Sequence, residues 1–475
     1  MPETALASMA TLRPRLIAHL QALEQGLLER DTATRLLLLA ALAGEHVLLI
    51  GPPGTAKSEL ARRLHRAFDG AHYFERLLTR FSTPEELFGP LSLKALEDDR
   101  YERLTEGYLP TAGIAFLDEV FKANSAILNA LLTLLNERTF DNGAGRHATP
   151  LISVVGASNE RPADESLQAF FDRFLLRVPV APVGDAAFAA LLQLGDGPTA
   201  PLPAPITADE RAAVRGAAAG VQLNDEALAA LHALRAEVAR LGLTVSDRRW
   251  RQLVGLMRCA AASEGRAGLD PIDLWLAPCV VCDDASSLPA VAAWVTQALV
   301  QAEAQPLTWL DHAVTAFEKQ LEIEQRLPAE EGGSADDDAG KLALLRSLGG
   351  HEGGEADQGM QRIHSKVLEE KQRRRFSPVH IAARLAQVDA LTQRAAAAAA
   401  SVQAAHDLLA ARLAPRLWLP PSLAQGWLGA HQQTLSTLAG LQARLADTRD
   451  GFAAHPVDEQ LPATAPPPVV LEAAG

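Results

Sequence analysis

The chain has 475 residues, of which 48% are hydrophobic but only 5% aromatic. This length suits about three domains of roughly 100 to 200 residues each, so a single small domain is excluded. The scarcity of aromatic residues beside abundant Ala and Leu favours a mostly helical protein. With 58 acidic against 44 basic residues the formal net charge is −14, which repels a nucleic-acid backbone and makes nucleic acid a poor candidate partner.

The sequence also lacks the usual signals for membranes and secretion. No apolar run approaches the roughly 18 to 20 residues that span a bilayer. Residues 1–15 do not show the basic and then apolar pattern of a secretory signal. We therefore expect a cytoplasmic protein without a transmembrane segment.

The first part of the chain alternates helical spacing with short buried runs. Helical spacing covers Leu6 to Ala43, and four short apolar runs follow at residues 47–50, 114–117, 151–155 and 174–178. Alternation of this kind predicts a parallel sheet covered by helices, and we place this domain at residues 1–195.

A second, all-helical domain is predicted after a linker. Residues 195–205 are rich in Pro and show no periodicity, which is typical of a linker. Residues 206–305 then show several Ala/Leu helices. The predicted N-caps in this domain are Asn224, Ser246 and Asp270.

The remainder is predicted to be a helical extension at residues 306–454. A polar and Gly-rich insertion at 328–360 is expected to be mobile. Two long amphipathic segments, at 376–413 and 423–450, flank a Pro-containing turn and predict an αα-hairpin. The Pro/Ala-rich residues 455–475 are predicted to be disordered.

A phosphate-binding loop follows the first predicted strand. Its residues are Gly51, Pro52, Pro53, Gly54, Thr55, Ala56, Lys57 and Ser58. Backbone N–H groups of such a loop surround phosphates, Lys57 reaches the terminal phosphates, and the Ser58 hydroxyl ligates Mg²⁺. Ala56 stands where the usual pattern has Gly, and we expect it to adopt a helical conformation that still presents its N–H.

Polar side chains end the next two predicted strands. Asp118 and Glu119 follow the strand at 114–117, and Asn159 follows the strand at 151–155. Strand ends at the carboxyl edge of a parallel sheet lie near bound ligands. We expect Asp118 to orient the Mg²⁺ shell, Glu119 to polarise the attacking water and Asn159 to sense the γ-phosphate of ATP.

These motifs and their neighbours resemble the MoxR family of AAA+ ATPases, most closely its RavA branch. The resemblance covers about Leu6 to Ala304, through Leu28-Glu-Arg30, the phosphate loop, Phe116-Leu-Asp-Glu-Val-Phe-Lys122, Asn136-Glu-Arg138 and Phe171-Asp-Arg-Phe174. It implies an α/β AAA+ core with a parallel sheet and an all-helical lid domain, to which the C-terminal helical hairpin is added.

The resemblance also implies a set of site residues. Leu28 and Glu29 would join the phosphate loop in binding ATP. Arg173 matches an arginine finger offered to the neighbouring subunit of a ring, with Arg138 as the competing candidate. A second sensor from the lid is Arg248 by register, with Arg249 next. Each of these arginines could equally serve in an ordinary surface salt bridge or helix end.

Activity and partners follow from the family. We expect a homohexameric, Mg-dependent ATPase that remodels or activates a protein partner, commonly one with a von Willebrand A domain. Hairpins at residues 88–110 and 139–149 would transmit the motion. The segment 328–359 is too short for the domain with which RavA contacts a lysine decarboxylase. A chelatase-type motor and a slow ATP-gated assembly scaffold are the alternatives.

Overall fold

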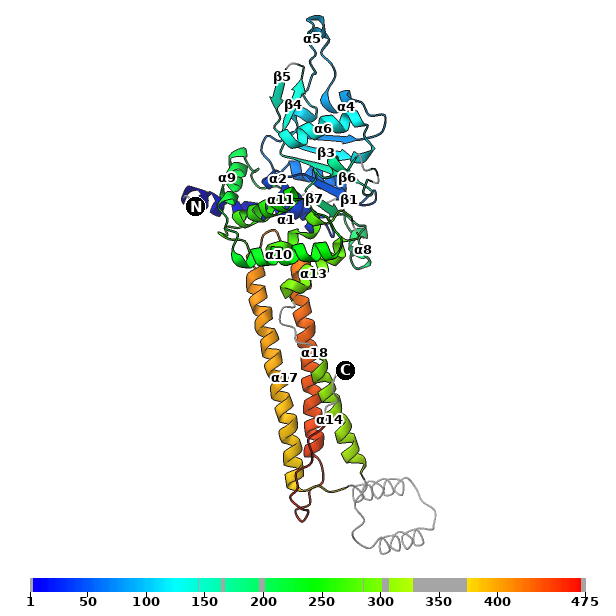
Figure 1. The fold of residues 1–475 in the computed structure, drawn as a ribbon, viewed down its shortest axis with the longest axis vertical. Coiled ribbons are helices and arrows are strands. Elements are labelled where there is room, and N and C mark those ends of the chain that lie inside the picture. Colours follow the sequence, from blue (N-terminus) through cyan, green and yellow to red (C-terminus); the bar gives the residue numbers. More distant parts are fainter. Residues whose placement is uncertain are drawn as a thin grey trace, which may run out of the picture. The chain divides into compact units, whose positions relative to one another are not determined.

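The computed structural model describes residues 3–143, 145–162, 164, 167–195, 201–284, 286–300, 307–327 and 374–470. They belong to two compact units (Figure 1). The first unit comprises residues 1–302 together with 411–427, and the second comprises 303–410 together with 428–475. The first two predicted domains thus share one compact unit, and the turn of the predicted hairpin belongs with them. The predicted mobile insertion at 328–360 lies outside the described residues.

A five-stranded parallel sheet forms the centre of the first unit. Its strands run in the order β2-β3-β6-β1-β7, with bounds β1 Val47–Ile50, β2 Tyr73–Leu77, β3 Ile114–Asp118, β6 Ser153–Ser158 and β7 Leu176–Pro179. The parallel sheet is as predicted. The strand β2 was not predicted, because its pattern is only half buried and carries Glu75 and Arg76, as suits a strand at the edge of a sheet.

The strand β6 extends further than the apolar run predicted. The run was expected to end at residue 155, but the ladder continues through Gly156 and Ala157, which pair with Leu48 and Leu49 of β1. Small residues fit here because helices and aromatic rings crowd the strand. A side chain at Gly156 would meet the ring of Phe174.

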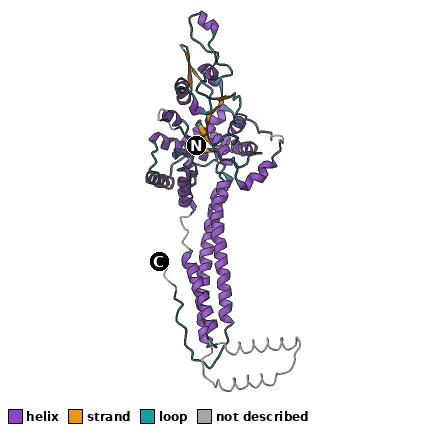
Figure 2. Ribbon diagram, turned by 90° about the vertical axis from the view of Figure 1, so that its right-hand side faces the viewer, coloured by secondary structure: helices purple, strands orange, loops and turns teal. Residues whose placement is uncertain are grey.

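Helices cover both faces of the sheet (Figure 2). Those that flank the strands are α1 Glu3–Glu24, α2 Asp31–Ala43, α3 Lys57–His65, α6 Ser125–Glu137, α7 Gln168–Phe171 and α8 Asp185–Leu192, with 3₁₀ turns η1 Leu109–Thr111 and η2 Val120–Lys122. The helix α2 is buried on almost every side, since it packs against α1, α3, α9, α11, β6 and β7. A helix that is apolar all round can form only in such a position.

The lid region is all helical, as predicted. Its elements are α9 Ala208–Ala219, α10 Asp225–Arg240, α11 Asp247–Ser263, η4 Pro271–Leu276, α12 Pro278–Val281 and α13 Leu288–Val300. The predicted N-caps are confirmed: the side chains of Asn224, Ser246 and Asp270 accept hydrogen bonds from Ala227, Arg249 and Ile272. In the last case the element is a 3₁₀ helix. Each cap satisfies an N–H group that the first turn leaves without a partner.

Two insertions interrupt the core. The second predicted hairpin is confirmed as β4 Thr139–Asn142 paired with β5 Gly145–Ala148. The first, at residues 88–110, follows α4 Pro84–Phe88 and contains α5 Leu93–Glu97, and its two arms form an isolated antiparallel bridge between Leu91 and Arg103 but no β-strand. It is therefore a loop with a short helix rather than a regular β-hairpin.

The turn of the C-terminal hairpin, residues 411–427, is anchored in the first unit by two tryptophans. Trp418 and Trp427 are 1% and 2% exposed. Their indole N–H groups donate to Ser263 Oγ at 2.8 Å and to Thr296 Oγ1 at 3.1 Å. Burying two such large rings with both polar atoms satisfied is strongly stabilising. Long-range contacts of this kind leave no periodic signal in the sequence.

Charged pairs reinforce this anchor. Arg416 contacts Asp270 and Asp273, both at 3.0 Å, and the guanidinium is only 5% exposed. Arg412 lies 2.8 Å from Asp270. The backbone N–H groups of residues 417 and 418 donate to Glu264 Oε1. These charges are paired and hydrogen-bonded. Removing one partner would leave an unpaired buried charge, which would destabilise the fold.

The second unit is built on three long helices that lie side by side (Figures 1 and 2). They are α14 Thr308–Arg326, α17 Pro378–Leu413 and α18 Pro421–Ala453, although the ends of α17 and α18 near the turn belong to the first unit. Their shared apolar core includes Val314, Val388 and Leu438. None of the helices in the described residues combines the length and apolarity needed to cross a membrane.

The tail differs from its prediction. Residues 455–475 were expected to be disordered, yet residues 467 and 469 contact the three-helix unit. Arg384 donates to Pro467 O at 2.9 Å, and Val469 packs against the apolar core. The composition lacks any period, but proline carbonyls still accept hydrogen bonds and valine still buries apolar surface.

Replacing Trp418 with Ala should destabilise the first unit by about 3 to 5 kcal/mol, because a fully buried ring leaves a cavity. Urea denaturation of the full chain measures the change. Trp418→Phe is the matched control: it keeps the aromatic ring, and Ser263 still donates to Cys259 O, so we expect a loss of roughly 1 kcal/mol. Equal losses in the two variants would contradict the packing role.

Candidate functional site

The phosphate loop lies between β1 and α3 at the carboxyl edge of the sheet. Gly51 donates to Ser158 O at 3.0 Å, and any side chain at this position would collide with Val180 O. Lys57 is 8% exposed and donates to Gly51 O and Pro52 O at 2.7 and 2.8 Å. Partial burial lowers the pKa of Lys57, while the carboxylates of Asp118 and Glu119 act to raise it. The ammonium thus lies in the curve of the loop, where phosphates bind.

Ala56 does not adopt the conformation expected from the sequence. Its backbone is left-handed, with φ 66° and ψ 24°, at the N-cap of α3. A helical conformation was expected here, and the structure instead places Ala56 just before the helix, as its N-cap. A residue with a Cβ is strained in this region by about 1 to 2 kcal/mol, and Gly avoids that strain. The usual Gly at this position therefore has a conformational cause.

The two predicted strand ends come together beside the loop. Asn159 Nδ2 donates to Glu119 Oε1 at 2.8 Å, and Lys122 Nζ lies 3.3 Å from Glu119 Oε2. Asp118 Oδ1 accepts from the backbone N–H of Glu119 at 3.0 Å. Glu119 itself has a left-handed backbone, with φ 51°. Such strain is often found at functional positions.

These residues line one open cavity of about 350 Å³, a size suited to a small ligand. It is lined by Pro53, Gly54, Thr55, Ala56, Lys57, Ser58, Phe116, Asp118, Glu119 and Asn159. The oxygen donors Ser58 and Asp118 fit a Mg²⁺ ion, which prefers oxygen ligands and takes only one or two from the protein when phosphates supply others. The predicted phosphate, metal and sensor residues are thus brought together.

The segment before α2 supports the loop from the other side. The Arg30 side chain, 6% exposed, donates from Nε to Thr55 O at 3.2 Å and from a terminal nitrogen to Ala181 O at 2.6 Å. Glu29 has φ 55° and accepts a hydrogen bond from Gly184 N at 2.9 Å. Leu28 is half-buried nearby in sequence. Arg30 therefore supports the phosphate loop, a role that was not predicted from the sequence.

The predicted arginines lie elsewhere, toward the amino edge of the sheet. Arg138 donates to Gly44 O, Leu151 O and Ile152 O, which precede β1 and β6. Arg173 is half-buried between α7 and β7, and its Nε has no hydrogen-bond partner in the described part of the chain. Neither lines the cavity at the phosphate loop of its own chain. The Arg138 side chain is committed to backbone carbonyls, so Arg173 is the freer of the two.

Arg248 and Arg249, at the start of α11, also differ in whether the side chain is engaged by hydrogen bonds. Arg249 is buried, and its side chain donates to backbone carbonyls and to Asp172. Arg248 is exposed and close enough to Glu45 to act electrostatically on it. Burial raises the pKa of Glu45 to about 7, although Arg138 and Arg248 act to lower it. The structure does not bring Arg248 to the phosphate loop of its own chain.

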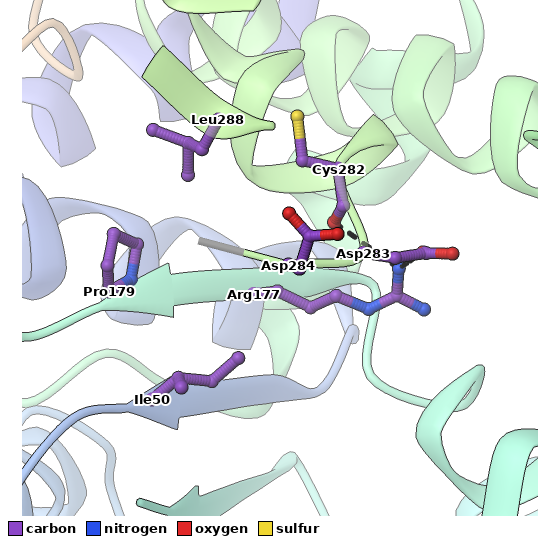
Figure 3. Close-up of a pocket in the computed structure, with 7 residues that line it drawn as sticks. All are labelled: Ile50, Arg177, Pro179, Cys282, Asp283, Asp284 and Leu288. Carbon is purple, nitrogen blue, oxygen red and sulfur yellow. Dashed lines mark hydrogen bonds and ion pairs between the residues drawn. The ribbon is translucent and has the colours of Figure 1, made fainter. Parts of the chain in front are cut away.

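A second, much smaller cavity lies between β7 and the lid (Figure 3). It is lined by Ile50, Arg177, Pro179, Cys282, Asp283, Asp284 and Leu288 and measures about 10 Å³. This volume is at the lower limit for a single water molecule. The hydrogen bond between Arg177 and Asp283 closes it on one side. This cavity is therefore a small packing gap between the core and the lid rather than a ligand site.

The geometry defines a class of protein. A phosphate loop, strand-end carboxylates and a polar sensor meet at the carboxyl edge of a parallel sheet, and a helical lid follows, which is the arrangement of an AAA+ ATPase. A family model described as the MoxR domain in the MoxR-vWA-beta-propeller ternary systems matches residues 14–200, and one for an AAA lid domain matches residues 226–295. The chain belongs to the MoxR family of AAA+ ATPases, and its place in the RavA branch stays a prediction.

Individual relatives agree with this assignment. Two uncharacterized proteins from Methanocaldococcus jannaschii are 44% and 41% identical, over 52% and 56% of this chain and 66% and 69% of their own lengths. Protein MoxR of Paracoccus denitrificans is 31% identical over 50% of this chain and 79% of its own. The crystal structure of a proposed ATPase from Cytophaga hutchinsonii has a TM-score of 0.51 at 15% identity, covering 62% of this chain and 97% of its own, which is a likeness of fold.

Ala56→Gly should leave the fold intact and raise the free energy of unfolding by about 0 to 1 kcal/mol. Gly removes the strain energy of the left-handed backbone, and this gain slightly exceeds the free-energy cost of the greater conformational entropy that Gly gives to the unfolded chain. Denaturation with and without ADP measures stability and binding together. Ala56→Val should be destabilised instead, because a β-branched residue tolerates positive φ poorly. A clear loss of stability in the Gly variant would contradict the observed backbone.

Glu45→Gln should change how stability depends on pH. The folded-state pKa of Glu45 is about 7 against 4.5 in the unfolded chain, so its contribution is fully present below pH 4.5 and is lost as pH rises through 7. The neutral Gln does not suffer this loss. The variant should therefore gain stability relative to the parent between pH 5 and pH 8.

Denaturant midpoints across this pH range measure the effect. Glu97→Gln, at an exposed position of α5, is the control for the same change of charge. Parallel curves for the parent and Glu45→Gln would show that burial of Glu45 has no such cost.

Proposed function

We propose that this chain is a Mg-dependent ATPase that works as a homohexameric ring and uses ATP turnover to remodel or activate a protein partner. The observation that carries the proposal is the convergence of Lys57, Asp118, Glu119 and Asn159 on one cavity. A site for nucleotide binding alone needs the loop, but it does not need a carboxylate held toward the cavity by a sensor amide. The hydrogen bond from Asn159 to Glu119 thus favours hydrolysis.

Each residue has a distinct part in the proposed reaction. The phosphate loop and Lys57 bind the ATP phosphates, and Ser58 and Asp118 hold Mg²⁺, which neutralises phosphate charge when bound. Glu119 polarises the attacking water. Asn159 fixes the orientation of the Glu119 carboxylate, and a γ-phosphate would compete for the same amide. The sensor therefore couples the presence of the γ-phosphate to the position of the base.

A ring supplies what one chain lacks. Arg173 does not line its own nucleotide cavity, and an arginine finger provided by the next subunit would stabilise transition-state charge. The helix α8 also supports association, because it buries none of its residues and exposes Phe188 and Leu192 by 52% and 71%. Exposed apolar groups of this kind commonly mark interaction surfaces. Arg248, exposed at the amino edge, would serve as a second sensor only across such an interface.

The first insertion is the proposed surface for the partner. Around α5 it exposes Leu93, Leu96, Tyr101 and Leu104 by 51% to 76%. Apolar side chains on a projecting loop are unfavourable in water unless they contact another protein. The matching family model is named for systems that also contain a von Willebrand A protein and a β-propeller. We propose a protein with a von Willebrand A domain as the partner.

Glu119→Gln should lower kcat for ATP hydrolysis by about 100-fold or more, since general-base catalysis contributes roughly 10² to 10⁴. The amide keeps the size of the side chain, so the affinity for ATP should change little. Steady-state hydrolysis and fluorescent-nucleotide titration measure the two quantities. Glu160→Gln, an exposed neighbour of Asn159, is the matched control and should hydrolyse ATP normally. Unchanged turnover in the Glu119 variant would contradict the proposed catalytic role.

The same variant tests the ring and its partner. Light scattering of full-length Glu119→Gln with ATP should give the mass of six chains, and a pull-down in ATP should retain a von Willebrand A protein that ADP releases. A monomer in ATP would contradict the ring. Failure to recover any such protein from cells that express one would contradict the proposed partner. Partner activation that persists without hydrolysis would favour the slow scaffold.

A further inference from the structure

The loop that carries Arg173 is held by a residue of the lid. Arg249, in the first turn of α11, donates from one terminal nitrogen to Phe174 O and Leu175 O, both at 2.9 Å, and from the other to Asp172 Oδ1 at 3.1 Å. These acceptors lie on both sides of Arg173. A planar guanidinium with its donors in a fixed fork defines the orientation of such a loop closely.

Arg249 is itself rigid. Only 4% of the residue is exposed. Its Nε donates to Val280 O at 2.7 Å, which joins it to α12, another helix of the lid. The Ser246 side chain caps α11 by accepting from the backbone N–H of Arg249. Because all three nitrogens of the guanidinium are used, Arg249 is not free to sense a phosphate.

A second buried arginine completes the clamp. Arg177 lies 3.2 Å from Asp172 Oδ1 and bonds the lid residue Asp283 (Figure 3). Its guanidinium carbon lies 3.9 Å from the ring centre of Phe171. The side chain of Asp172 is 47% exposed, yet those of Arg177 and Arg249 are only 2% and 5% exposed. A half-exposed carboxylate thus receives two buried cations, one from β7 and one from the lid.

Arg173 contrasts with the residues around it. Its backbone N–H donates to Phe170 O at 3.0 Å, so the main chain is fixed from within the loop as well. The Nε of its side chain has no hydrogen-bond partner in the part of the chain that the structure describes. Hydrogen bonds thus hold the main chain on both sides of Arg173 but not the Nε of its side chain.

We propose that Arg249 is a positioning residue for Arg173, so that the lid of one subunit controls the presentation of an arginine to the ATP of the next. This inference rests on the proposed role of Arg173 as an arginine finger. If the lid shifts relative to the core during turnover, the bonds from Arg249 move residues 172–175 with it. A displacement of about 1 Å at a catalytic group can cost on the order of 100-fold in rate. The clamp therefore links lid movement in one subunit to hydrolysis in its neighbour.

The test is a double-mutant cycle in the full-length ring, read as kcat at saturating ATP. Arg173→Ala should lower kcat by about 10³, the lower end for removal of an arginine finger. Arg249→Met should lower it by about 10- to 100-fold. In the Arg173→Ala background, Arg249→Met should change kcat by less than about twofold, because a positioning residue has nothing left to position. Arg249→Lys should recover part of the loss.

Further measurements separate positioning from general damage. The affinity for ATP should stay within about twofold in every variant, since Arg249 does not line the nucleotide cavity. Arg266→Lys, at a half-buried lid arginine bonded to Asp273 and Glu264, is the matched control and should keep its kcat. If Arg249→Met does not fold, Asp172→Asn takes its place in the cycle, because it removes the shared carboxylate from a half-exposed position.

The outcomes are distinct. Equal losses from Arg249→Met in both backgrounds would overturn the inference, because Arg249 would then act independently of Arg173. A loss of kcat in Arg266→Lys as large as that in Arg249→Met would overturn it too, since any damage to the lid would suffice. An unchanged kcat in Arg173→Ala would instead reject the finger itself and, with it, a positioning role for Arg249. A non-additive cycle with preserved ATP affinity supports the proposal.

Discussion

The parallel register of β1, β6 and β3 is the constraint on which the site depends. Ile50 pairs with Ser158, and Leu117 pairs with Gly156. The phosphate loop, the sensor amide and the acidic pair all begin within a residue or two of these positions. The pairing of the strands therefore brings three segments that are distant in sequence to one edge, where the hydrogen bond from Asn159 to Glu119 joins two of them. A slip of one residue would turn the side chains of a strand to the other face and separate the groups.

The two edges of the sheet are used in opposite ways. At the carboxyl edge, loop N–H groups and oxygen donors surround a cavity that a charged ligand can fill. At the amino edge, arginine side chains donate to carbonyls that precede the strands: Arg138 donates to those before β1 and β6, and Arg249 to those before β7. Buried carbonyls without such donors would each cost about 1 to 3 kcal/mol. The amino edge is thus internally satisfied, and Arg173 stands out there because its side chain is not engaged in the same way.

The sequence predicted those features that depend on local pattern. The parallel sheet, the caps at Asn224 and Ser246 and the αα-hairpin all come from periodicity or from residue types at helix starts. Features set by tertiary packing were not predictable in this way. Arg248 and Arg249 are adjacent and chemically identical, and only Arg249 meets acceptors from the Asp172 loop and from α12. The left-handed backbone of Ala56 and the burial of Trp418 likewise depend on segments far away in the sequence.

The N-terminal end of α2, with its N-cap residue Arg30, connects the phosphate loop with the turn of the C-terminal hairpin. Arg30 bonds Thr55 O in the loop. One residue later, Asp31 Oδ2 accepts from Ser422 Oγ at 2.7 Å, and Arg35 donates to Leu417 O. The neighbours of Leu417 in the same turn, Arg416 and Trp418, are bonded to the lid. The helix α2 that begins here is buried among core and lid helices. The turn of the hairpin is therefore attached where the nucleotide loop, the core and the lid meet.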